Sequence, residues 1–146
     1  MRPLHATLCN LEPQVAAHAG AMFDVLSDPA IYEFENAPPS SAIWLAERFA
    51  RLETRLSPDG SEQWLNWVVR LPSNDLAGFV QATVASPGMA TVACVLASRH
   101  WRQGIGRCAM LAMFDELGSA YGVHTLLAVI KTRNVRSQGF FQHLGF

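Results

Sequence analysis

Two glycines among cationic side chains are the residues whose types and spacing most directly suggest chemistry. Gly104 and Gly106 stand where a predicted helix begins, just after a predicted strand. This arrangement aims unpaired backbone N–H groups and the positive end of a helix dipole at one spot, and no Cβ obstructs an incoming anion. Arg99, Arg102 and Arg107 add positive charge around it. The run is typical of a phosphate-binding turn, although a tight turn without a ligand would show the same pattern.

The run does not match the two best-known phosphate-binding signatures. It lacks the Gly-Lys-Ser/Thr ending of a P-loop. It also lacks the third glycine and the downstream acidic residue of a dinucleotide-binding fold. A phosphate-binding α/β protein of another type is therefore one interpretation of this region.

Charge is distributed unevenly along the 146 residues, whose formal net charge is −1. Residues 1–98 hold five arginines and ten acidic residues (−5), whereas residues 99–146 hold six basic and two acidic residues (+4). The asymmetry suggests an anion on the C-terminal half, with ordinary surface scatter as the alternative. The near-neutral total argues against general nucleic-acid binding, and a composition that is 50% hydrophobic and 16% charged excludes a disordered chain.

Three cysteines, Cys9, Cys94 and Cys108, form an odd set without a CxxC spacing, and no HExxH motif is present. Neither a disulfide framework nor a metal site is predicted from this pattern. Because each cysteine has apolar neighbours, we expect small, buried, reduced side chains.

One stretch requires a test for membrane crossing, because residues 76–98 contain no charged side chain and are long enough to span a bilayer. A Pro-Gly turn and several polar residues interrupt it, which favours two strands joined by a hairpin. The N-terminus also lacks the apolar run of a signal peptide. The sequence therefore predicts a cytoplasmic protein that does not contact a membrane.

The elements that must position the two glycines follow from hydrophobic periodicity and turn residues. In the first half, we expect a strand over 6–11, a helix that opens near Pro13 and ends before Asp28-Pro29, and a second helix capped by Ser40-Ser41. The apolar stripe of the second helix comprises Leu45, Phe49, Leu52 and Leu56.

The second half is predicted to be a strand meander followed by a crossover. The expected elements are strands over 64–71, 76–85 and 89–97, a helix over 105–121, a strand over 123–130 and a helix over 134–144. The order β-α-α-β-β-β-α-β-α indicates one mixed α/β domain over 1–146, with four antiparallel strands first and a β-α-β unit last.

Two motifs in the C-terminal half of the chain resemble those of the GNAT N-acetyltransferase superfamily. Its acetyl-CoA pyrophosphate loop, usually written [R/Q]-x-x-G-x-[G/A], is similar to Trp101-Arg102-Gln103-Gly104-Ile105-Gly106. Tryptophan at the first position departs from the pattern and is similar to the branch of ribosomal-protein-alanine and aminoglycoside-type acetyltransferases. Residues 134–146 resemble the family's N-x-x-[A/S]-…-L-G-F ending. The motifs cover 92–146, and the N-terminal part resembles the family only in element order.

The resemblance implies a site for acetyl-CoA as co-substrate. In this family the strand before the loop splays from its neighbour, and the pantetheine arm inserts as a pseudo-strand. The backbones that would bond the pantetheine are those of Cys94, Val95 and Leu96, and one N–H there would polarise the thioester carbonyl. The residues that would hold the pyrophosphate are Trp101, Arg102, Gln103, Gly104, Ile105 and Gly106, with Arg107 adding charge.

Two polar residues near the second motif receive roles from the same resemblance. Asn134 would contact the pantetheine or its amides, with a helix N-cap as the alternative or additional role. Ser137 would contact the coenzyme or assist the departing thiolate. No proton-transfer residue is carried over, because the position of the tyrosine acid of many relatives is Phe141 and strand 89–97 contains no acidic residue.

Glu33 and Glu35 fall in the loop where the family builds its acceptor wall. Together with Asp28 they favour a cationic amine acceptor, and the two glutamates could take its proton through water. A solvated acidic loop without a ligand is the alternative interpretation.

These implications lead to an acetyl-CoA-dependent N-acetyltransferase that acts by direct attack on a primary amine of a small molecule or a protein N-terminus. The alternative is a non-catalytic acyl-CoA-binding or regulatory module on the same fold. Relatives are often dimers, which makes a homodimer an expectation by analogy. Relatives also continue beyond Leu144-Gly145-Phe146 into two further antiparallel strands, so we expect a truncated sequence or strands supplied by a partner chain.

Overall fold

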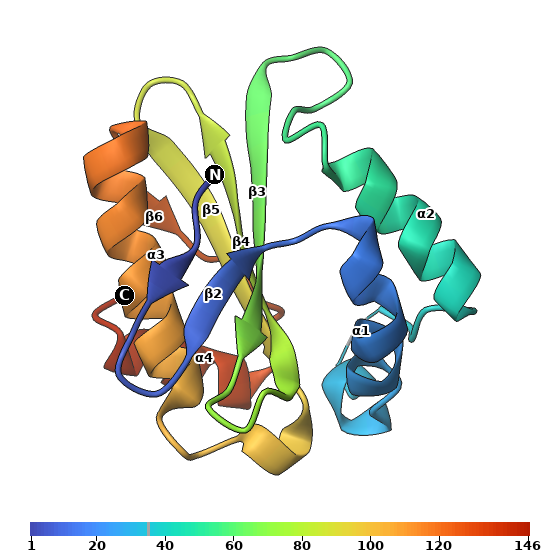
Figure 1. The fold of residues 1–146 in the computed structure, drawn as a ribbon. Helices are drawn as coiled ribbons and strands as arrows, with labels where there is room; N and C mark the ends of the chain where they lie inside the picture. Colours follow the sequence, from blue (N-terminus) through green and yellow to red (C-terminus); the bar gives the residue numbers. More distant parts are fainter. Residues whose placement is uncertain (35) are drawn as a thin grey trace.

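One curved sheet forms the centre of the protein in the computed structural model, which describes residues 1–34 and 36–146. Its strands follow one another in chain order, and each pairs antiparallel with the next until the final, parallel pair. The strands are β1 (Leu4–His5), β2 (Asn10–Pro13), β3 (Glu62–Arg70), β4 (Leu76–Ala85), β5 (Met89–Leu96) and β6 (Thr125–Leu127) (Figure 1). The predicted mixed α/β class is confirmed.

Helices cover both faces of this sheet. The α-helices are α1 (Ala19–Leu26), α2 (Ala42–Leu52), α3 (Ile105–Tyr121) and α4 (Val135–His143). Short 3-10 helices span Ala16–His18, Pro29–Tyr32 and Ser98–His100. Figure 1 shows α1 and α2 on one side and α3 with α4 on the other.

Alternation along β3 explains this two-sided arrangement. Trp67 and Val69 are buried in the core beneath α3, whereas Val68, between them, is buried in the core beneath α1 and α2. Because successive side chains of a strand point to opposite faces, one strand serves both cores. Both faces must therefore be apolar at the centre of the strand, which is why residues 64–69 are apolar except for Asn66.

The prediction of one strand over 6–11 is wrong. Two short strands pair there instead, and the turn between them is closed by a hydrogen bond from the Ala6 N–H to the Cys9 carbonyl at 3.0 Å. Leu4 and Leu11 become cross-strand partners and both are buried. Burial of this apolar pair explains the hairpin, and it raises the number of antiparallel strands before the crossover from the expected four to five.

The end of α2 also differs from the prediction. Leu45 and Phe49 are buried as expected, but the helix ends at Leu52. Arg55 has a left-handed backbone (φ 61°), and Leu56 forms an isolated β-bridge with Gln63. Leu56 is therefore not part of the helical stripe, because the chain has already turned toward β3.

The strands β5 and β6 diverge soon after they meet. Their pairing joins Met89–Thr91 to Thr125–Leu127, which is shorter than the strand predicted over 123–130. On its other side, β5 stays paired with β4 as far as Leu96. Within the described residues, the edge of Val92–Leu96 that faces away from β4 thus has no strand partner, and the expected splayed pair is confirmed.

Candidate functional site

A short connection after β5 delivers the chain to the N-terminus of α3, and we call residues 101–107 the coenzyme loop. Gly104 is the N-cap residue of α3 with a left-handed backbone (φ 79°), a conformation that favours glycine. Among the described residues no side chain caps the first turn, and residues 102–104 are exposed. The first backbone N–H groups of the helix therefore have no side-chain acceptor among the described residues, as an anion site requires.

Gly106 has a packing role that its spacing did not indicate, and its predicted contact with the pyrophosphate stays a prediction. It is buried, and a Cβ there would lie 3.3 Å from the ring of Phe140 and 3.4 Å from a methyl of Leu96. The missing side chain thus allows α4 to pack against the first turn of α3 and the end of β5. Substitution at Gly106 would disturb that packing as well as any ligand.

Side chains of the coenzyme loop fix its shape. The indole Nε1 of Trp101 donates to the carbonyl of Leu96 at 2.9 Å, and the amide of Gln103 donates to the carbonyl of Arg99 at 3.0 Å. Arg107 donates to the carbonyl of His143 at 2.8 Å, which ties α3 to the end of α4. The departure at Trp101 therefore supplies a hydrogen bond that closes the turn after β5.

The strand β5, which precedes the coenzyme loop, has main-chain groups available to a ligand but no reactive side chain at the positions predicted to bond pantetheine. Burial raises the pKa of the Cys94 thiol to about 12, so the thiol stays protonated at neutral pH. Gly78 of β4 allows a close approach, because a Cβ there would lie 1.9 Å from the carbonyl oxygen of Val95. Leu96 buries its side chain in the core. The residues predicted to bond pantetheine are adjacent along the unpaired edge of β5.

Asn134 caps α4, as the alternative interpretation expected. Its side-chain oxygen accepts a hydrogen bond from the backbone N–H of Ser137 at 3.0 Å. Ser137 is half-buried in the first turn of this helix. A role for either residue toward the coenzyme stays a prediction.

The acidic loop meets the coenzyme loop through a residue that the sequence did not single out. The carboxylate of Glu33 pairs with the guanidinium of Arg136 at 2.7 Å. That guanidinium lies 4.3 Å from the ring centroid of Trp101 and 5.6 Å from that of Phe34. No sequence signal connects these partners, since Glu33 and Arg136 are 103 positions apart. Glu35 lies outside the described residues.

Asp28 is engaged within the protein. One carboxylate oxygen accepts the backbone N–H of Ser98 at 2.6 Å, and the other accepts that of Ala30 at 3.0 Å. The hydrogen bonds to Ser98, followed by that to Ala30, hold the pKa of this carboxyl below its usual value. Both oxygens of Asp28 thus already accept hydrogen bonds from the main chain, and its predicted contribution to acceptor binding stays a prediction.

Candidates for proton transfer are few. Phe141, at the position of the tyrosine of many relatives, is only 5% exposed, with ring centroids 5.3 Å from Phe140 and 5.1 Å from Phe146. Burial and the nearby Arg99 lower the pKa of His100. His124 is exposed beside Thr125. None of these three residues is therefore assigned as the acid or base of the reaction.

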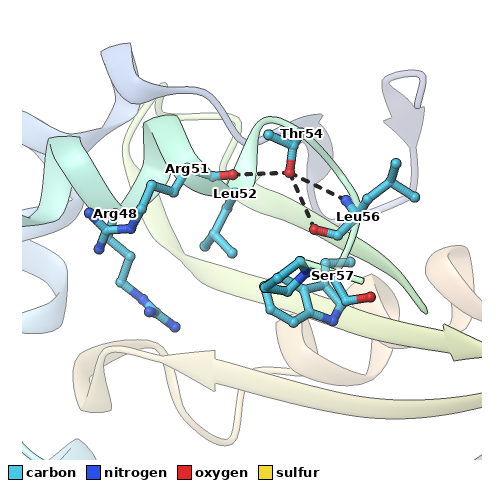
Figure 2. Close-up of a pocket in the computed structure, with 8 residues that line it drawn as sticks. Arg48, Arg51, Leu52, Thr54, Leu56 and Ser57 are labelled. Carbon is cyan, nitrogen blue, oxygen red and sulfur yellow. Dashed lines mark hydrogen bonds between the residues drawn. The ribbon is translucent and has the colours of Figure 1, made fainter. Parts of the chain in front are cut away.

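A surface pocket of about 480 Å³ lies between the C-terminal end of α2 and the start of β3 (Figure 2). Its lining includes Arg48, Arg51 and Trp64, and no residue predicted for the coenzyme or acceptor. A second pocket of about 230 Å³ lies between α1 and the β3–β4 hairpin and includes Arg99. The first pocket is separate from the coenzyme loop, whereas the second reaches the short 3-10 helix before it.

In the part of the chain that the structure describes, no group of three or more His, Cys, Asp or Glu residues could hold a metal ion. None of the helices in these residues is long and apolar enough to cross a membrane.

Comparison with protein families gives a match over nearly the whole chain. Residues 9–146 match a family described as "Acetyltransferase (GNAT) domain". A comparison with curated proteins finds no significant match.

Solved structures of low sequence identity share the fold. A Vibrio cholerae protein provisionally described as a ribosomal-protein-serine acetyltransferase is 17% identical, with a TM-score of 0.81 over 98% of this chain and 82% of its own. Mycobacterium smegmatis RimJ, in complex with CoA-disulfide, is 18% identical (TM-score 0.78; 99% and 73%). RimL, a ribosomal L7/L12 alpha-N-protein acetyltransferase bound to coenzyme A, is 13% identical (TM-score 0.76; 94% and 78%).

Proposed function

The chain belongs to the GNAT acetyltransferase family, and we propose that it transfers an acetyl group from acetyl-CoA to a primary amine. The observation that carries this proposal is the unpaired edge of Val92–Leu96, which leads directly to the uncapped N-terminus of α3. A strand edge can bond an extended amide-bearing arm, and a helix N-terminus can bind phosphate. The two features follow each other in the order that the coenzyme's arm and pyrophosphate require.

Main-chain groups would make most of the contacts with the coenzyme. Of the predicted residues Cys94, Val95 and Leu96, those with backbone groups that point away from β4 would bond the pantetheine amides along the free edge of β5, whereas the Val95 carbonyl lies against Gly78 of β4. The coenzyme loop would cradle the pyrophosphate. The loop residues involved would be Trp101, Arg102, Gln103, Gly104, Ile105, Gly106 and Arg107. The exposed Arg102, whose backbone is left-handed (φ 58°), would supply charge that reaches the phosphates.

The proposed reaction is direct attack of a neutral amine on the thioester carbonyl. A carbon–nitrogen bond forms, the carbon–sulfur bond breaks, the amine loses one proton and the thiolate gains one. A backbone N–H of β5 would stabilise the developing oxyanion, and Ser137 would donate toward the departing sulfur. Positioning would supply much of the rate, with water taking the amine proton, because no side chain is assigned as a general base.

The acceptor is proposed to approach beside the acidic loop. Glu33 and Glu35 would form the acceptor wall, and Glu33, whose side chain is 53% exposed beside Arg136, would share its negative charge with that cation. RimL is named for acetylation of a protein N-terminus, which makes a protein N-terminus one proposed acceptor class beside small-molecule amines. A homodimer is a further proposal.

A non-catalytic acyl-CoA-binding module is the second candidate function. The observations that favour it are the buried Phe141 at the usual acid position and the absence of an acidic residue from β5. Both candidates share the coenzyme site and differ only in turnover.

Thiol release from acetyl-CoA separates the two candidates. We expect the wild-type protein to release thiol above the hydrolysis background with at least one member of a panel of amines, peptides with free N-termini and aminoglycosides. The Gly104→Glu variant should lose this activity, whereas Gly20→Glu should keep it, because Gly20 is exposed on α1 with open space for a Cβ. Coenzyme binding without release across the whole panel would favour the non-catalytic module.

A further inference from the structure

A polar bridge joins residues 28–34, which we call the acceptor segment, to the coenzyme loop. Arg136 is at its centre, because its guanidinium pairs with Glu33 and lies against the rings of Phe34 and Trp101. Glu33 and Phe34 belong to the acceptor segment, while Trp101 is the first residue of the coenzyme loop. One side chain from the first turn of α4 thus touches both regions.

Two further hydrogen bonds fix the ends of the acceptor segment. At its start, the Asp28 carboxylate accepts the N–H of Ser98, which lies just after β5. At its end, the guanidinium of Arg133 donates to the Phe34 carbonyl at 2.9 Å. Both partners flank the proposed coenzyme site, one on the strand side and one on the α4 side. The acceptor segment is therefore attached to the site at both ends.

The environment of Arg136 indicates that the bridge has little effect on overall stability. The side chains of Arg136 and Glu33 are 44% and 53% exposed, and ion pairs in such positions contribute little to the free energy of unfolding. The planar guanidinium, however, contacts two aromatic rings from separate parts of the chain, a contact that lysine reproduces only in part. The arrangement suits a local link between two segments better than a general stabiliser.

We propose that Arg136 is a positioning residue that couples the coenzyme loop to the acceptor segment. A coenzyme that orders the loop around Trp101 then also holds Glu33 and Phe34 in place, and an acceptor bound at the segment favours coenzyme binding by the same factor. This inference rests on the proposed function, because it assigns the coupling to the same two sites. The expected coupling is about 5-fold, at the low end of the usual range.

Hydrogen–deuterium exchange of the amides in residues 28–34 tests the bridge, with coenzyme A as the probe. In the wild-type protein, saturating coenzyme A should slow exchange about 5-fold. In Arg136→Gln, exchange should be faster even without coenzyme, and the slowing on addition of coenzyme should disappear. Arg136→Lys should restore part of it. The matched control is Arg48→Gln, which should behave as the wild type, since Arg48 is exposed on α2 and lines the pocket between α2 and β3 that is separate from the coenzyme loop.

The outcomes separate this inference from the proposed function. If the wild-type protein fails to bind coenzyme A in calorimetry, the proposed function fails, and the coenzyme-free comparison of wild type with Arg136→Gln still tests the bridge. Unchanged exchange in coenzyme-free Arg136→Gln would overturn the proposal. So would slowing by coenzyme A of equal size in both proteins, because a purely structural Arg136 would leave the coupling intact.

Discussion

The proposed coenzyme side and the proposed acceptor side of this protein are built in different ways. On the coenzyme side, the features that would bind a ligand belong to the main chain: the unpaired edge of β5, the left-handed turn at Gly104 and the uncapped start of α3. On the acceptor side, the segment over 28–34 is held by side chains, through Asp28 with Ser98 and Glu33 with Arg136. Main-chain features tolerate changes of side chain that leave the backbone in place, whereas side-chain contacts depend on each partner's identity.

A methyl group at Gly78, where β4 and β5 approach each other closely, should give the largest loss in the free energy of unfolding. Gly78→Ala would place a Cβ 1.9 Å from the Val95 carbonyl oxygen, so β4 and β5 must separate. We expect a loss of about 3 kcal/mol or more in the free energy of unfolding. Urea denaturation measures it, with Gly20→Ala on the exposed face of α1 as the control that should be neutral or stabilising. Equal stability of Gly78→Ala and wild type would show that the backbone here is free to adjust.

A hydroxyl on residue 141, where many relatives have a tyrosine, should give the next largest loss in the free energy of unfolding. Phe141→Tyr adds a hydroxyl to a ring that is 5% exposed and packs against Phe140 and Phe146. We expect about 1–3 kcal/mol of destabilisation and no gain in thiol release. A rise in turnover, measured at a temperature where both proteins are folded, would contradict this and would show that residue 141 reaches the reacting atoms.

The Asp28 contact should have a smaller effect that depends on pH. Its carboxyl has a lowered pKa in the folded protein, so its contribution is present above the ordinary pKa of about 4 and is lost as the pH falls through the lower folded value. At pH 7 we expect Asp28→Asn to cost about 1 kcal/mol, less than the ~1.5–3 kcal/mol of a well-buried hydrogen bond to a charged group, because solvent screens this partly exposed site. Urea unfolding from pH 7 to pH 3 should show the difference between the two proteins shrinking below about pH 4, and a constant difference would contradict the assignment.

The smallest effect is expected from the exposed ion pair. Glu33→Gln should change the free energy of unfolding by less than about 0.5 kcal/mol, because both partners are largely in water. The same variant should nevertheless speed amide exchange within residues 28–34. A large change in global stability would show that the acceptor side is part of the core and would remove the distinction between the two sides.

The difference between the two sides also explains what the sequence could and could not predict. The meander of β3, β4 and β5 and the helix α3 follow from periodicity and turn residues, since those signals are local. Gly104 was predicted at the helix start because a glycine at a helix cap is a local signal. The hairpin of β1 and β2 was missed, because the pairing of Leu4 with Leu11 outweighs the β-propensity of residues 6–11.

Contacts between distant residues were beyond the sequence. Arg136 lies inside the motif at residues 134–146, yet nothing in that motif indicates its contact with Glu33 or Trp101. The packing role of Gly106 against Phe140 was likewise hidden, because spacing alone does not show which neighbour fills the space of a missing side chain. These contacts belong to the tertiary structure, and they lie mainly where the acceptor segment meets the proposed coenzyme site.

Calorimetric titration with coenzyme A of wild type, Gly104→Glu and Gly20→Glu tests most directly the claim that main-chain groups of this turn hold the coenzyme. Gly104→Glu puts a carboxylate and a strained backbone at the N-terminus of α3, while Gly20→Glu adds the same side chain to an open surface position. Gly104→Glu is preferred to Gly106→Glu, because a side chain at Gly106 would also clash with Phe140. We predict binding by wild type and Gly20→Glu and affinity at least about 100-fold weaker for Gly104→Glu, the product of strain and charge repulsion. Equal affinity of all three proteins would contradict the claim.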